Sequence, residues 1–148
     1  MRHKPCLTLD DVFRMVAASR DAAADLKLEA TIAVVDAGGH LLYLERPDSQ
    51  GANGVEMATL KARTAALRER PSSAFAKRVR ERPGFLMVPN CLGVQGGVPI
   101  VHDGECIGGI GVSGISEHDE AVAKIGAEAL VGAAGRTARP KKARTRRA

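Results

Sequence analysis

The stretch GGVPIVHDGECIGGIGVSG, residues 96–114, decides how the rest of this chain can fold. Two apolar runs, Val98–Val101 and Cys106–Val112, flank the turn residues Asp103 and Gly104. Asp-Gly between two such runs is the strongest short-range signal for a β-hairpin. Seven of the nineteen residues are glycine, and glycine weakens a strand interior unless something approaches its backbone closely. We therefore expect a hairpin whose second strand lies against a packed helix or a ligand.

Another hairpin is predicted nearer the N-terminus. Thr31–Val35 is a short β-branched run, Asp36–Gly39 holds turn residues, and His40–Glu45 returns as the partner strand. Leu92–Val94 is predicted as a further, weak strand. Since hairpins pair antiparallel, all of these strands fit one antiparallel sheet.

Four helices are predicted around the strands. They run from Thr8 to about Leu28, over Val55–Arg68, from Ser73 to about Glu81 and from Glu117 to about Leu130. Thr8 with Asp11 approximates a capping box, and Ser73 and Ser116 are the predicted caps of the third and fourth helices. The predicted class is α+β, with a single antiparallel sheet of about five strands and packed helices.

Length and composition indicate one soluble domain. The chain has 148 residues, of which 45% are hydrophobic and 26% charged. No apolar run approaches the roughly 20 residues of a membrane span. The N-terminus shows no hydrophobic signal-peptide region, so a cytoplasmic location is expected.

The basic character of the chain comes from its last residues. Positions 136–148, RTARPKKARTRRA, hold seven of the 22 basic residues and no acidic one. The other 15 basic residues are outnumbered by the 17 acidic ones. Such a run is typical of a disordered, solvated tail, and contact with nucleic acid is the alternative. With no Trp, one Tyr and three Phe, a stacking platform is not expected, nor is a specific nucleic-acid partner.

The three cysteines predict no disulfide framework. Cys6, Cys91 and Cys106 are odd in number and show no C-x-x-C spacing, so we expect free thiols in a reducing compartment. The same spacing argues against a structural zinc site.

Five blocks in order carry a resemblance to a known family. They are IAVVDAGGHL (32–41), KARTAA (61–66), GGVPI (96–100), GIGVSG (109–114) and DEAVAKIG (119–126). Together they resemble the GlcG/HbpS family, a domain also similar to the C-terminal part of PduO-type corrinoid adenosyltransferases. The resemblance covers about Leu7–Leu130, and we take residues 7–132 as the domain. It implies a profilin-like layered fold, homo-oligomers and, in several members, heme binding.

Where members of the family tend to read Arg-Met-Asp-Gly, this chain has Arg46-Pro47-Asp48-Ser49. Pro47 removes a thioether that would line a pocket and stiffens the loop.

The resemblance leads us to expect a heme or other tetrapyrrole pocket between the KARTA helix and the glycine-rich strand. A heme site needs an axial ligand, an apolar slot and cations for the propionates. The residues expected at the cofactor are Arg46, Lys61, Thr64, Gly109, Gly111 and Gly114. Arg46 and Lys61 would hold anionic groups, although Lys61 also fits a solvated helix face.

The axial ligand is open. His40, His102 and His118 are the weak metal-ligand candidates, and each also fits an exposed turn or surface position. The family shares no single obvious ligand, so none is transferred.

Two other functions compete with heme binding. The first is an enzyme or accessory protein acting on a small organic acid, with Lys61 and Asp48 in the site. A Lys among small apolar residues can have its pKa lowered by desolvation and can bind a carboxylate. The second is a structural assembly module.

Overall fold

The structure, a computed structural model, describes residues 1–130. Its elements are α1 (Leu9–Asp25), β1 (Thr31–Asp36), β2 (Leu41–Glu45), α2 (Gly54–Arg68), α3 (Ser72–Glu81), η1 (Pro83–Met87), β3 (Gly97–His102), β4 (Glu105–Ser113), η2 (Ser116–His118) and α4 (Asp119–Ala129). Here η marks short 3-10 helices. The basic tail predicted at 136–148 lies outside the described residues.

The four strands form one antiparallel sheet in the order β2-β1-β4-β3. Both predicted hairpins are present, and the glycine-rich β4 is central because it pairs with β1 and with β3. The α+β class is confirmed, but the expected count of about five strands is one too many. Leu92–Val94 is not a strand, because the Leu92 amide donates to the Thr64 hydroxyl of α2 at 2.7 Å.

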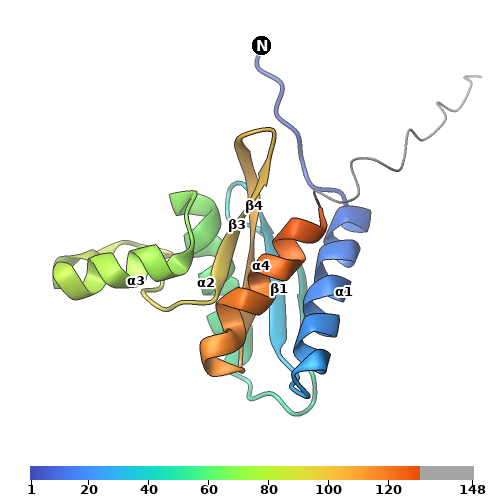
Figure 1. The fold of residues 1–148 in the computed structure, drawn as a ribbon. Coiled ribbons are helices and arrows are strands. Elements are labelled where there is room, and N and C mark those ends of the chain that lie inside the picture. Colours follow the sequence, from blue (N-terminus) through green and yellow to red (C-terminus); the bar gives the residue numbers. More distant parts are fainter. Residues whose placement is uncertain (131–148) are drawn as a thin grey trace, which may run out of the picture.

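Helices cover both faces of the sheet, which gives three layers (Figure 1). Against one face, α1 and α4 pack side by side over the main core, in which Met15, Ile32 and Ile110 are almost wholly buried. The other face is covered by α2. That contact consists of small side chains, namely Ala33, Val35, Ala58, Ala62 and Ala66. Because these side chains are short, the backbone of α2 comes close to the sheet.

Beside this body, α3 and η1 project to one side (Figure 1). Glu69 ends α2 in the left-handed region, with φ 52°, and turns the chain toward α3. The predicted cap of α3 at Ser73 is wrong, because α3 begins at Ser72, directly after Pro71, and has no side-chain capping bond. The Ser73 hydroxyl instead bonds the Glu120 carboxylate at 3.0 Å.

The predicted cap of the last helix is wrong. Ser116 has a φ of 55° and begins η2, without a side-chain capping bond. Asp119, the first residue of α4, accepts a hydrogen bond from the Ile115 amide at 3.0 Å. An aspartate thus binds the backbone at this junction, where the sequence favoured a serine.

The start of α1 is as predicted. The Thr8 hydroxyl accepts a hydrogen bond from the Asp11 amide, and the Asp11 carboxylate accepts one from the Thr8 amide at 2.9 Å. Burial raises the pKa of Asp11, but the hydrogen bonds from Thr8 and the charge of Arg14 outweigh it and hold that pKa below its usual range. At the other end, α1 stops at Asp25, before the expected Leu28, because Lys27 takes a φ of 58°.

We expect Thr8→Ala to lower the free energy of unfolding by about 1 kcal/mol, since it leaves an amide of the first turn without its acceptor. Thr8→Ser keeps the hydroxyl and should retain most of that free energy. Urea unfolding at neutral pH measures both variants. Equal losses in the two variants would contradict a capping role for the hydroxyl.

Candidate functional site

The seam between α2 and β4 is closed by direct backbone contact. A Cβ added at Gly109 would collide with the carbonyl of Ala62, and one at Gly111 with the carbonyl of Ala58. Gly97 of β3 meets the carbonyl of Lys61 in the same way. Of the two explanations for the glycine-rich strand, helix packing is therefore the one present at Gly109 and Gly111. No opening for a flat ligand lies at these two glycines.

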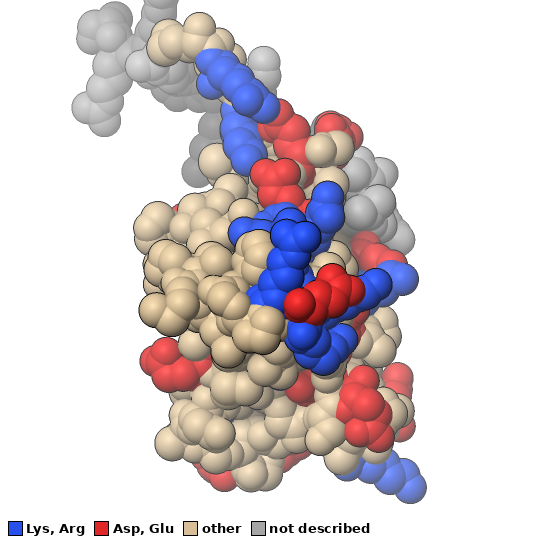
Figure 2. Space-filling model, turned by 90° about the vertical axis from the view of Figure 1, so that its left-hand side faces the viewer, with Lys and Arg blue, Asp and Glu red and all other residues tan. Residues whose placement is uncertain are grey.

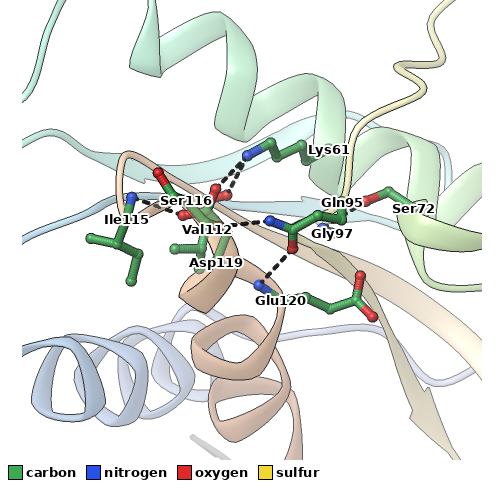
Figure 3. A network of polar contacts seen from close by, with 9 residues as sticks. All are labelled: Lys61, Ser72, Gln95, Gly97, Val112, Ile115, Ser116, Asp119 and Glu120. Carbon is green, nitrogen blue, oxygen red and sulfur yellow. Dashed lines mark hydrogen bonds and ion pairs between the residues drawn. The ribbon is translucent and has the colours of Figure 1, made fainter. Parts of the chain in front are cut away.

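Lys61 points into the protein and is not a solvated cation. It is 2% exposed, and its ammonium donates to the Asp119 carboxylate at 2.8 Å and to the Val112 carbonyl at 3.0 Å (Figure 3). These bonds join α2, β4 and the start of α4. The Lys61–Asp119 pair is a structural clasp, and Lys61 does not reach a ligand from this position.

Further polar contacts surround the clasp (Figure 3). Gln95 donates to the Ser116 carbonyl at 2.6 Å and accepts from the Glu120 amide at 3.2 Å. Beside it, the Gly97 amide donates to the Ser72 hydroxyl at 2.8 Å. The junction is thus held by groups from four separate stretches of the chain.

Thr64 is also occupied within the fold. It is fully buried, and its hydroxyl donates to the Leu60 carbonyl at 2.7 Å while accepting the Leu92 amide. Thr64 therefore holds the segment before β3 against α2 and offers no free polar atom to a cofactor.

The remaining predicted residues lie at the loop after β2. Arg46 and Asp48 are exposed there. Gly114, with φ 114°, faces the Gln50 side chain, which itself donates to the Glu29 carbonyl at 2.7 Å. Asp48 is exposed, whereas Lys61 is buried and bonded to Asp119, and no hydrogen bond or ion pair within residues 1–130 joins the two.

The three histidine candidates lie at the two ends of the sheet. His40 and His102 are at the turns β1–β2 and β3–β4, at one end of the sheet, while His118 is in η2 at the other. Each is accessible and has a carboxylate within 4 Å: Asp36 for His40, Asp103 for His102 and Glu117 for His118. Among residues 1–130, no three His, Cys, Asp or Glu side chains cluster as a metal site would require.

Two of the three thiols, those of Cys91 and Cys106, are poor nucleophiles in this fold, whereas Cys6 is exposed. Cys91 is partly buried and Cys106 is buried, and burial raises the pKa of both. The Cys106 sulfur contacts the Gly108 carbonyl at 3.3 Å. No Cys–His pair for nucleophilic catalysis follows from these positions.

A cavity of about 450 Å³ opens where the end of α1 meets the starts of β1 and the loop after β2. Its lining is mostly apolar, and two cations, Arg20 and Arg46, and two carboxylates, Glu29 and Glu45, supply its charged groups. Arg20 and Glu45 pair with each other across it at 2.9 Å, whereas Arg46 makes no ion pair in the part of the chain described. Of the residues predicted for the cofactor, Arg46 alone lines this cavity.

The sequence analysis missed the rest of this lining. It comprises Arg20, Ala23, Ala24, Leu28, Glu29, Ala30, Ile32, Glu45 and Pro47. The available signal was the run of small residues at Ala22–Ala24, where short side chains at a helix end leave a hollow.

The fold and this cavity define a small α+β domain with a hollow of the size usual for small-molecule sites. None of the described helices is long and apolar enough to cross a membrane.

Comparison with known proteins gives the family. Residues 7–128 match the family described as "Haem degrading protein HbpS-like", and the chain belongs to this family. It is 37% identical over 114 residues to protein GlcG of Escherichia coli K12, which covers 76% of this chain and 85% of GlcG.

Solved structures agree with this assignment. A double mutant of HbpS from Streptomyces reticuli has a TM-score of 0.82 and 32% identity, covering 88% of this chain and 90% of that one. A structure described as a PduOC:heme complex has a TM-score of 0.76 and 25% identity, covering 84% and 95%. The predicted family resemblance is confirmed.

Proposed function

We propose that this protein binds heme and does so as a homo-oligomer. The observation that carries the proposal is the likeness, over 84% of the chain, to a PduOC protein solved with heme. Membership of a family described as haem degrading supports the same ligand. The proposal concerns binding. Degradation is tested separately, by loss of the bound heme's absorbance when a reductant and dioxygen are both supplied.

The apolar cavity beside Arg46 is the place we assign to the macrocycle. Its volume of about 450 Å³ falls within the range of about 300–1,000 Å³ that is usual for small-molecule sites. Ala23, Ala24 and Ile32 provide apolar contacts, and Arg46, which makes no ion pair within residues 1–130, is placed to hold a propionate. The proposed site thus includes Arg46, as the sequence predicted. It does not lie at the α2–β4 contact, where Gly109 and Gly111 leave no space for a ligand.

We assign the iron ligand to a second subunit. None of the histidines lines the cavity, yet His40, His102 and His118 are accessible to a neighbouring molecule. An imidazole from a partner would complete the site, which makes assembly a condition of tight binding. The free cysteines favour a reducing, cytoplasmic location for such an assembly.

The structure does not support the alternative function, an enzyme or accessory protein for a small organic acid that uses Lys61. Lys61 is buried and bonded to Asp119, so it offers no ammonium to a carboxylate substrate. The other alternative, a structural assembly module without a ligand, is tested by the experiment below.

We expect Arg46→Gln to weaken hemin binding by about tenfold or more, because it removes the charged contact to a propionate. One of His40→Ala, His102→Ala and His118→Ala should weaken it to a similar extent, because it removes the iron ligand. Absorbance in the Soret region reports the binding. Arg14→Gln is the matched control, since Arg14 pairs with Asp11 away from the cavity.

Mixing the two weakened variants then tests whether the site is shared. If cavity and ligand come from different subunits, mixed oligomers regain some intact sites and part of the Soret shift. Full hemin affinity in all four variants would leave the structural module as the better description.

A further inference from the structure

The proposed heme site makes no use of a strongly basic hollow at the corner between α2 and α3. Arg68, Arg70, Lys77 and Arg78 line a cavity of about 350 Å³ there, and Glu81 is the one carboxylate in its lining. An adjoining hollow of about 300 Å³ shares Arg68, Arg70 and Arg78. Figure 2 shows Lys and Arg side chains gathered on this face of the molecule. We call these four cations the arginine corner.

Local packing holds two of the guanidinium groups in place. The Arg68 guanidinium lies 5.2 Å from the centre of the Phe75 ring, and that of Arg78 lies 4.7 Å from the centre of the Phe85 ring. Cations held over aromatic faces in this way keep their N–H donors at the rim of the ring. The left-handed conformation of Glu69 brings Arg70 round to the same hollow.

The guanidinium donors of the arginine corner are unused within the described chain. The guanidinium groups of Arg68, Arg70 and Arg78 make no hydrogen bond or ion pair with any of residues 1–130, and Lys77 lies 4.0 Å from Glu81 in an exposed pair. Four cations facing one carboxylate in a hollow repel one another, and a bound anion would relieve that repulsion.

We propose that the arginine corner binds a small polyanion, a molecule carrying adjacent phosphate or carboxylate groups. Guanidinium groups match both of these groups in bidentate geometry, and the net charge of the lining favours a ligand with several negative charges. The hollow's limited volume fits a compact molecule rather than an extended surface. This proposal does not depend on heme binding.

Titration calorimetry of the full-length protein with pyrophosphate, and separately with citrate, tests the proposal. We expect saturable binding of one polyanion per subunit, weakened about tenfold or more in Arg68→Gln/Arg78→Gln. Stronger binding of pyrophosphate identifies phosphate as the preferred group, and stronger binding of citrate identifies carboxylate.

The matched control is Arg80→Gln/Arg82→Gln. It removes the same charge from the same part of the chain, but neither residue lines the arginine corner. A second control replaces the seven basic residues of 136–148 with Ser, because these also attract anions. Thermal unfolding verifies that each variant is folded. Equal losses in the two double variants, or binding that disappears with the tail charges, would overturn the proposal.

Discussion

Replacing Lys61 with Met should lower the free energy of unfolding by about 3–5 kcal/mol, the usual cost of removing one partner from a buried ion pair. The Asp119 carboxylate is only 4% exposed and would stay in the protein without its cation. The Val112 carbonyl would lose its donor at the same time. Urea unfolding followed by circular dichroism measures the loss.

The matched control is Lys124→Met. Lys124 is also in a helix and lies 3.9 Å from a carboxylate, Glu128, but this pair is exposed, so its loss should cost less than about 1 kcal/mol. The double variant Lys61→Met/Asp119→Leu removes both buried charges and should recover part of the stability. If Lys61→Met were no more destabilising than Lys124→Met, the clasp would not be a structural element.

Gly111→Ala should destabilise the fold by about 3 kcal/mol or more, at the upper end of what overpacking costs. The added methyl would meet the Ala58 carbonyl and the Ala62 amide, both of them helix backbone, so relief requires α2 to move off the sheet. The α2–β4 contact is the largest between any two elements, and its loss would affect the whole fold. Thermal and urea unfolding measure the effect.

Gly84→Ala provides the comparison. No atom lies within 4 Å of a Cβ built at Gly84, so the same substitution there should change stability by less than about 0.5 kcal/mol. Similar stabilities for the two variants would mean that α2 does not rest on the glycines of β4.

Local signals predicted much of this fold. Turn residues marked both hairpins, and the spacing of Thr8 and Asp11 marked the start of α1. The extra strand at Leu92–Val94 was wrong because a single side chain distant in sequence, Thr64, binds the Leu92 amide. The three residues Leu92–Val94 carry no sequence pattern that indicates a partner 28 positions earlier in the chain.

The candidate site was harder to predict because its parts meet only in the folded chain. Lys61 was expected to face a ligand. It is instead buried against Asp119, which lies 58 residues further along the sequence and accepts its hydrogen bond. The cavity beside Arg46 is built from α1, β1 and the loop after β2, none of which shows a binding motif. A family resemblance can indicate the ligand, but it does not locate the pocket.

Heme binding at a defined site is best tested by hemin titration of a chain whose seven basic residues at 136–148 are replaced by Ser, because this removes adsorption of the anionic hemin to the tail. We expect a Soret shift that saturates at a fixed ratio of hemin to subunit, and light scattering should show an oligomer in the same samples. A linear response without saturation would contradict heme binding at a defined site.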